Sequence, residues 1–356
     1  MEKLSSKNIT IKKENKESNN LKNMELIQDI INDSYIQPKV KGYNYINTFC
    51  VFKSINNIIY LIYSDKNNSI ITFNLINNKK LNEIKRPHQK PISSFRNYID
   101  EINKKELLMS ISQRDNNIQI WNIRNLELIY NFKKINEIGS LYSACFLKNN
   151  NNQIYIATSN YTDKCPNNIQ IFNLNGEKIK DINNSDENTF FIDVYYDISS
   201  LKTFIITGNI GYVKSYDYDI NKIYFEYKDK YNSYSNHINL IINKKDNIIR
   251  LIESCTYGYI RIWNFHTNIL LRKIISKTQI KSICLWNDEY LFVGYTKGKI
   301  RLLEIESESF IKDINYNDDD DAYTIYINKI NHPKYGECLI YQAKNLIQYL
   351  LNNVFS

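Results

Sequence analysis

Short runs of alternating or continuous apolar residues fill the chain, and three of them are nearly the same. The run NNIQIWNI at residues 116–123 recurs as YGYIRIWNF at 257–265 and as NNIQIFNL at 167–174. Each run alternates apolar and polar positions, which is typical of a β-strand. Ile, Tyr and Phe dominate these runs, in agreement with strand propensity, and no stretch keeps a helical period. The pattern therefore predicts an all-β fold.

The aromatic position of these runs serves as an anchor for a longer repeat. An apolar–polar–apolar run that reaches such an anchor occurs seven times, at intervals of 40 to 51 residues. The anchors are Phe73, Trp121, Phe172, Tyr216, Trp263, Leu303 and Leu350. A period of about 45 residues is the length of one four-stranded propeller blade.

The residues around each anchor supply the other strands of such a blade. In the second unit, two apolar strand patterns at 92–98 and 106–112 precede Trp121, and the more polar ELIYNFKK follows it. The inner strands of a blade are buried between neighbouring blades, whereas the outermost strand keeps one edge in water. We therefore expect a seven-bladed β-propeller of four-stranded antiparallel blades.

The two ends of the chain suggest how the ring closes. The seventh unit stops after its third strand, at Leu350, and the segment MELIQDII at 24–31 precedes the first unit without a partner. We expect this N-terminal strand to complete the last blade, since that would remove two unpaired edges. Residues 23–356 then form a single propeller, and the Lys-rich residues 1–22 form a disordered tail, because they contain too little apolar material to bury.

These repeats resemble those of the WD-repeat β-propeller family, with no specific member indicated. The Trp-Asp dipeptide of the family corresponds to Trp121-Asn122 and Trp263-Asn264 here, and to Phe-Asn or Tyr-Asp in three other units. The family's repeats contain a buried network of His, Ser or Thr, Asp and Trp. The resemblance implies a structural network of this kind at His88, Asp115 and Trp121 in the second unit and at His237 and Trp263 in the fifth, where Tyr257 stands in place of the Asp.

Motifs for catalysis are absent from the sequence. It has no nucleophile elbow, no phosphate-binding glycine loop, and no Cys or His spacing of a zinc site. The six cysteines and four histidines are scattered. We expect no enzymatic activity, no cofactor and no catalytic or metal-binding residue. The net charge of +8 comes from Lys spread along the chain.

The candidate partner-binding residues lie in turns and links expected on one face of the ring, around the narrow mouth of the channel. They form a cationic ring with one tyrosine beside an acidic loop, and are Lys66, Arg114, Lys164, Tyr257 and Lys297 together with Asp318, Asp319, Asp320 and Asp321. Such a mouth would suit an acidic peptide. The alternative is that a Lys-rich chain has Lys in its turns by composition and that the acidic run is a solvated loop.

Fold-level analogy with the family implies a non-catalytic protein–protein interaction scaffold or adaptor. We expect a monomeric propeller within a complex, whose protein partners the sequence does not identify. The chain has no signal peptide and no apolar run of about 18 residues, so we expect a cytoplasmic protein, with the nucleus as the alternative.

Two other functions stay open. The first is an anionic-surface binder, of a phosphoinositide membrane or RNA, that would use the Lys-rich turns and the N-terminal tail. The nearest match to the lipid-binding motif of propellers, LLRKI at 270–274, has Arg272 and Lys273 but lacks the glycine. The second is a propeller enzyme with a site in the channel.

Overall fold

The computed structural model describes residues 48–351 of the 356-residue chain, apart from 66, 78, 134–139, 162–168, 183–188, 230–234, 243–247, 256, 277, 287, 297–298, 316–323, 334–335 and 344–345. The expected tail at 1–22 lies outside the described residues. So does the segment at 24–31 that was expected to close the ring.

Six four-stranded antiparallel sheets are each built from four consecutive strands. The first contains β1 (Thr48–Lys53), β2 (Ile59–Ser64), β3 (Ile70–Asn74) and β4 (Lys79–Ile84). The second contains β5 (Ser94–Asp100), β6 (Lys105–Ser112), β7 (Asn117–Asn122) and β8 (Leu128–Lys133), with the short 3-10 helix η1 (Gln113–Asp115) between β6 and β7. The third contains β9 (Ser140–Lys148), β10 (Ile154–Tyr161), β11 (Ile169–Asn173) and β12 (Lys178–Asp181).

The remaining sheets continue the same order. The fourth contains β13 (Phe191–Asp197), β14 (Lys202–Gly208), β15 (Tyr212–Asp217) and β16 (Lys222–Lys228). The fifth contains β17 (Ser235–Ile242), β18 (Ile249–Cys255), β19 (Tyr259–Asn264) and β20 (Leu270–Ile275). The sixth contains β21 (Ile280–Leu285), β22 (Tyr290–Tyr295), β23 (Lys299–Glu304) and β24 (Ser309–Asn315). A three-stranded sheet of β25 (Thr324–His332), β26 (Gly336–Ala343) and β27 (Leu346–Leu351) ends the described chain.

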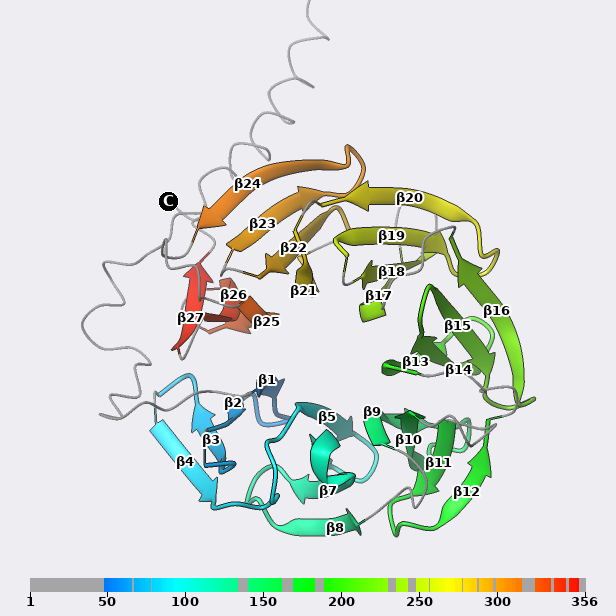
Figure 1. The fold of residues 1–356 in the computed structure, drawn as a ribbon. Coiled ribbons are helices and arrows are strands. Elements are labelled where there is room, and N and C mark those ends of the chain that lie inside the picture. The colour runs from blue at the N-terminus through cyan, green and yellow to red at the C-terminus, as the bar shows by residue number, and fades with distance from the viewer. Residues whose placement is uncertain are drawn as a thin grey trace, which may run out of the picture.

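These sheets stand around a central opening, with their first strands innermost and their last strands at the rim (Figure 1). The fold is therefore an all-β propeller, as the repeat predicted. The prediction of seven four-stranded blades is wrong, because the described residues form six four-stranded blades and one three-stranded sheet. Within the described residues, the last repeat contributes the three strands β25, β26 and β27.

The anchors mark the third strand of every sheet. Trp121 lies on β7 and pairs with Leu108 of β6, and Trp263 lies on β19 and pairs with Leu251 of β18. In all six four-stranded blades the outer strand shifts register by one residue where it passes the anchor. A bulge at this point bends the outer strand, which then follows the curved rim.

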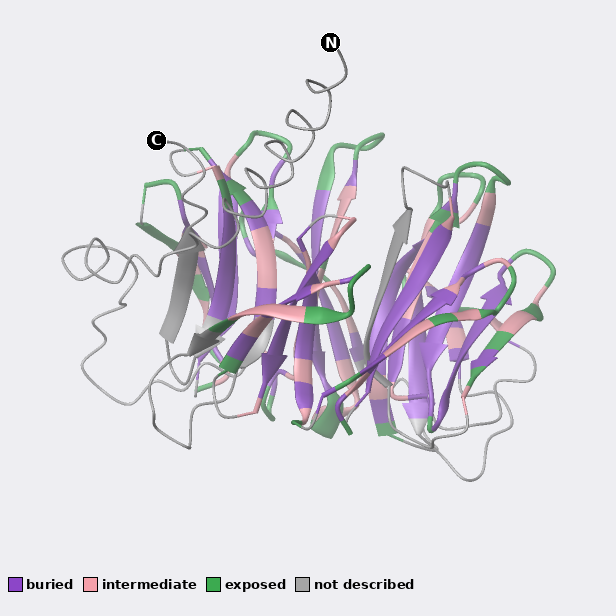
Figure 2. Cartoon of the chain, turned by 90° about the horizontal axis from the view of Figure 1, so that it is seen from above, coloured by how far each residue is buried: buried purple, intermediate pink, exposed green. Residues whose placement is uncertain are grey.

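The hydrophobic core lies between neighbouring sheets, because each inner strand is covered on both faces. Trp121 of the second sheet packs with Phe52 and Ile62 of the first sheet. Trp263 of the fifth sheet packs with Phe204 of the fourth sheet. Figure 2 shows the inner strands buried along their length and the turns exposed at both ends. This sandwiching explains the nearly continuous apolar runs of the second strands in the sequence.

Candidate functional site

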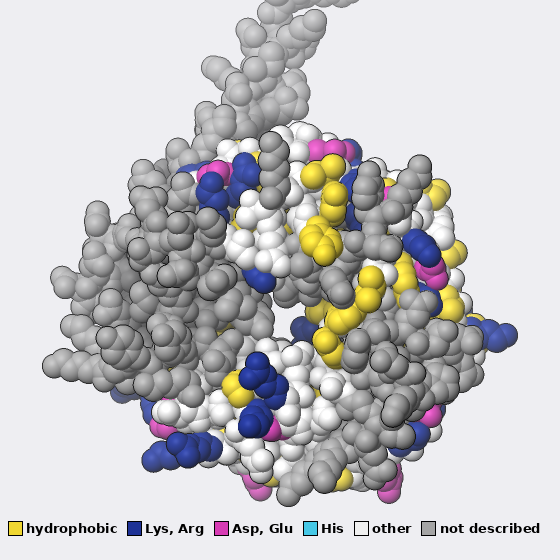
Figure 3. Space-filling view, viewed as in Figure 1, with side chains coloured by type: hydrophobic (Ala, Val, Ile, Leu, Met, Phe, Trp, Pro, Cys, Tyr) yellow, Lys and Arg dark blue, Asp and Glu magenta, His cyan; other side chains and the backbone are white. Residues whose placement is uncertain are grey.

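One face of the propeller carries the turn between β6 and β7 and the turn between β18 and β19. We call it the turn face, and it is the face seen in Figures 1 and 3. Arg114, in the first of these turns, and Tyr257, in the second, are both exposed there. The other predicted partner-binding residues, Lys66, Lys164, Lys297 and Asp318 to Asp321, lie outside the described residues.

The second blade contains a buried hydrogen-bond network beneath this face. The His88 Nε2 atom lies 2.8 Å from the Ser110 hydroxyl oxygen, and the Trp121 indole N–H donates to the same oxygen at 2.9 Å. His88, Ser110 and Trp121 are almost completely buried. Burial lowers the pKa of His88 to about 4, against an opposing effect of Asp115, so the imidazole is neutral at pH 7.

Asp115 acts on His88 through its charge, and it binds the backbone of the link before β5. Its carboxylate accepts a 2.7 Å hydrogen bond from the backbone N–H of Lys90, and the Gln119 side chain donates to the backbone carbonyl of Pro87 at 2.9 Å. These contacts hold the link before β5 against the β6–β7 turn. They thereby hold the backbone of the turn that carries Arg114.

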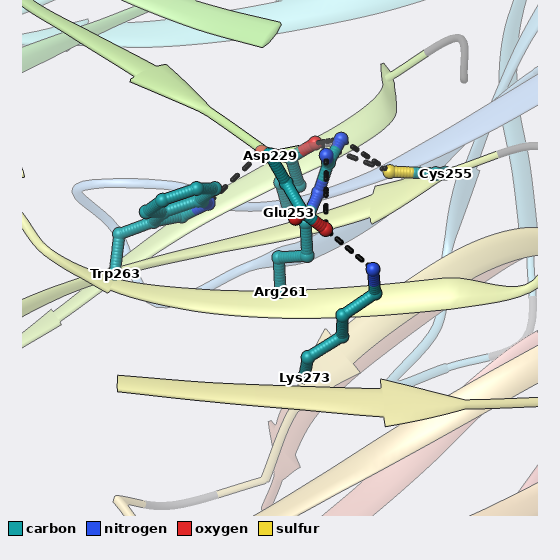
Figure 4. Close-up of polar contacts among 6 residues, drawn as sticks. All are labelled: Asp229, Glu253, Cys255, Arg261, Trp263 and Lys273. Carbon is teal, nitrogen blue, oxygen red and sulfur yellow. Dashed lines mark hydrogen bonds and ion pairs between the residues drawn. The ribbon is translucent and has the colours of Figure 1, made fainter. Parts of the chain in front are cut away.

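The fifth blade has a different network at the corresponding place (Figure 4). Ser110 is two residues beyond the residue that pairs with Trp121, and Glu253 is two residues beyond the residue that pairs with Trp263. The Trp263 indole N–H donates to the Glu253 carboxylate at 3.1 Å. A fully buried carboxylate therefore takes the place that a serine has in the second blade.

Arg261 balances this buried charge. It pairs with Glu253 across β18 and β19, and its guanidinium donates to the Glu253 carboxylate and to the Cys255 sulfur, the latter at 3.1 Å. Burial by itself lowers the pKa of Arg261, but Glu253 and Cys255 raise it above its usual value. The pKa of the Cys255 thiol is raised well above its usual value by burial and by Glu253, so the thiol stays protonated.

The network continues to the outer strand through Asp229. Its carboxylate forms an ion pair with Lys273 of β20 and lies 4.0 Å from the Arg261 guanidinium. Glu253, Arg261 and Asp229 were not among the residues predicted from the sequence. Opposite charges at facing positions of two otherwise apolar strands were the signal that could have found the first two. His237 of this blade lies on β17, opposite Ser254.

The β18–β19 turn above this network presents an exposed tyrosine. Gly258 has a φ of +85°, and a Cβ atom there would lie 2.3 Å from the Ser276 carbonyl oxygen. The Ser276 N–H donates to the Gly258 carbonyl at 2.7 Å, which holds the turn against the end of β20. Tyr257 and Ile275, which flank this contact, are each 64% exposed.

Hydrophobic side chains gather on the same side of the turn face. Figure 3 shows them in two groups, over the blade of β17–β20 and beside the central hole. Ile210, in the β14–β15 turn, is exposed, and the rings of Tyr142 and Phe190 pack edge to face with centroids 4.9 Å apart. Exposed apolar groups of this kind on a rigid surface are typical of protein-binding sites.

The central channel contains a cavity of about 550 Å³. The first strands of five sheets, β1, β5, β9, β13 and β21, supply most of its wall, together with β25. Its charged lining residues within the described part of the chain are Arg96, Asp193 and Lys281. The remaining lining combines Ser, Thr, Asn and Gln with apolar and aromatic side chains.

The described residues contain no group of three His, Cys, Asp or Glu side chains placed to hold a metal ion. They also contain no helix that is both long and apolar enough to cross a membrane.

Comparison with known proteins identifies the fold. No protein-family model matches the chain, and no curated protein matches its sequence. Among solved structures, Raptor from Chaetomium thermophilum matches with a TM-score of 0.66 and 14% identity over 88% of this chain. This chain spans only 28% of the length of Raptor. BBS1N, solved in complex with ARL6DN, matches with a TM-score of 0.66 and 12% identity, covering 91% of this chain and 98% of that one. At these identities the similarity shows the propeller fold alone.

Proposed function

We propose that this protein is a non-catalytic interaction scaffold of the WD-repeat type, which binds other proteins through its turn face. The WD-repeat assignment is supported by the second blade, where His88 and Trp121 meet on the Ser110 hydroxyl. That is the arrangement implied by the resemblance of the sequence to the family. The fifth blade keeps the tryptophan and replaces the serine by Glu253.

The observation that carries protein binding is the exposure of Tyr257 and Ile275, each 64%, on a turn fixed by backbone contacts. A rigid turn loses little conformational entropy when a partner binds, so its apolar groups contribute more of their burial to affinity. Tyrosine is also among the residues that most often dominate interface energetics. The BBS1N propeller was solved with a second protein, ARL6DN, and we extend to this chain only the coarse role of holding a protein partner.

An anionic membrane is less well supported as the partner. In the segment nearest to a lipid-binding motif, Arg272 forms ion pairs with Glu306 and Glu308, and Lys273 forms one with Asp229. These charges are therefore already neutralised by the protein itself. We do not assign a headgroup site to this segment.

Tyr257→Ser is expected to weaken capture of the partner at least about tenfold, because it removes an exposed aromatic side chain from the proposed binding surface. The measurement is quantitative affinity purification of the tagged full chain from its native cell, with proteins compared between wild type and variant. Ile102→Ser is the matched control, since Ile102 is 63% exposed in the β5–β6 turn on the opposite face. Equal capture by wild type and Tyr257→Ser would contradict the proposal. So would a loss that Ile102→Ser reproduces.

A further inference from the structure

The apolar clusters between neighbouring blades share one feature. In five of them the anchor of a blade packs in one cluster with an apolar side chain from the outer strand of the preceding blade, or from the residue directly after that strand. The Phe132 ring lies 6.1 Å from that of Phe172, and the Tyr227 ring lies 6.0 Å from that of Trp263. We call these side chains the cover residues, and they are Ile84, Phe132, Ile182, Tyr227 and Ile274.

The cover residues occupy the same register position in their blades. Phe132 of β8 pairs with Ile118, which stands three residues before the anchor Trp121 on β7. The cover residues of the other four blades meet the third strand at the same offset. A strand added outside β27 would therefore place its own cover residue opposite Ile347, three residues before Leu350.

The cluster between the last sheet and the first blade differs from these five. Among the described side chains, the last sheet contributes Ile330, Cys338 and Ile340 to it, all from β25 and β26. The anchor of the first blade, Phe73, is only half-buried, whereas the anchors of the second to sixth blades are at most 7% exposed. Figure 1 shows β27 as the outermost labelled strand of the last sheet. Phe73 therefore lies where a cover residue packs in the other blades.

The turn after the anchor also contacts the preceding outer strand. Arg272 of β20 forms an ion pair with Glu306 of the next blade, and the Asn82 amide of β4 donates to the Arg124 carbonyl at 3.3 Å. Glu306 and Arg124 each stand three residues after an anchor. The residue at that place in the first blade is Ile76, which is 43% exposed. A second apolar group is thus uncovered beside Phe73.

The rim of the first blade is basic next to this place. β4 and the two residues after it carry four exposed cationic side chains and one exposed carboxylate, so their net charge is three positive units. These residues are Lys79, Lys80, Glu83, Lys85 and Arg86. Such a rim attracts a segment that carries acidic side chains.

We propose that a protein partner completes the last blade by adding an extended segment along β27, with a large apolar side chain against Phe73 and Ile76 and acidic side chains toward the basic rim. Within the described part of the chain, β27 pairs only with β26, which leaves its other edge to a further strand. Strand addition of this kind takes affinity from main-chain hydrogen bonds and specificity from alternate side chains. The inference rests on the proposed function as a protein-binding scaffold, and it adds a second surface and the kind of segment bound there.

The probe is a fluorescent nonapeptide in which Glu and Val alternate around a central Phe. Fluorescence polarisation with the full chain is expected to show binding at least about tenfold tighter than for the same peptide with a central Ser. Two further peptides carry N-methyl groups on the odd or on the even backbone amides. Only one of these two patterns is expected to abolish binding, because alternate amides of an added strand point toward β27.

Ile76→Ser and Phe73→Ser are each expected to weaken binding of the Phe peptide, and Phe73→Ser to remove the preference for Phe over Ser. Ile55→Ser is the matched control, since Ile55 is 40% exposed in the β1–β2 turn of the same blade. Tyr257→Ser is expected to bind the peptide as wild type does, so that failure of the turn-face proposal and failure of strand addition are distinguishable. Thermal melting checks that each variant is folded, and Ile76→Ser provides the test if Phe73→Ser does not fold.

Three results would overturn the proposal. The first is equal affinity of wild type for the Phe and Ser peptides, or for both N-methylated peptides and their parent. The second is unchanged binding by the folded variants of Ile76 and Phe73. The third comes from a photoreactive amino acid at position 76 of the purified full chain: an adduct with residues 24–31 or with a second copy, in place of the peptide, would assign the edge of β27 to this chain itself.

Discussion

Arg261→Ala is expected to lower the free energy of unfolding by about 3 to 5 kcal/mol. The reason is that Glu253 is fully buried and would lose the guanidinium that neutralises it. The Trp263 indole and the Cys255 thiol would remain as hydrogen-bond donors to this carboxylate, but neither carries a charge. Urea denaturation of wild type and variant, followed by tryptophan fluorescence, measures the difference.

An exposed ion pair provides the control for this experiment. Lys80 and Glu83 form a pair on the outer strand β4, with the lysine side chain 51% exposed. Lys80→Ala is expected to cost no more than about 1 kcal/mol, because water solvates the carboxylate that remains. If Arg261→Ala costs no more than Lys80→Ala, the buried pair does not stabilise the fifth blade as described.

Acidification is expected to destabilise the second blade through His88. The pKa of this imidazole is lowered to about 4 in the folded protein, from a usual value of 6.5. The unfolded chain therefore binds one more proton than the folded chain between these two pH values, and stability falls as the pH drops from about 6.5 to about 4. The full shift corresponds to about 3 kcal/mol. Urea denaturation at a series of pH values between 7 and 4 measures it.

His88→Gln removes this proton uptake, so its stability is expected to depend less on pH by about 3 kcal/mol over the same range. His266→Gln, which removes a half-buried imidazole that contacts Tyr224, is the control. Parallel pH profiles for wild type and His88→Gln would show that the histidine of the network does not titrate as its burial requires.

The sequence predicted the strands and their repetition because inner strands of a propeller face apolar neighbours on both sides. That environment imposes continuous apolar runs such as ELLMSIS in β6, and it places a large side chain at each anchor. Trp121 and Trp263 were found this way, and both lie on the third strand of a blade. The local sequence pattern therefore indicated the length of the repeat and the position of the third strand within it.

The number of four-stranded blades could not be obtained in this way. A count of anchors treats every third strand alike, whereas a complete blade also needs an outer strand, and the last described sheet consists of β25, β26 and β27 alone. Outer strands have the weakest sequence signal because half of their side chains face water. β4, for example, is mostly exposed along its length.

The buried charges were missed for a different reason. Glu253 and Arg261 are separated by eight residues and become partners only when β18 and β19 pair in register. The wall of the central cavity is less visible still, since Thr48, Arg96 and Ser282 come from three different sheets. Their convergence depends on the closed arrangement of the sheets, which no local pattern specifies.

The most direct test of the turn face as a protein-binding surface is site-specific photo-crosslinking in the native cell. A photoreactive amino acid is placed at position 257, and in a second strain at position 198, where Ile198 is 77% exposed in the β13–β14 turn of the opposite face. We predict covalent adducts with a discrete protein from position 257 and none of comparable yield from position 198. Adducts with RNA or lipid alone, or equal protein adducts from both positions, would contradict the account.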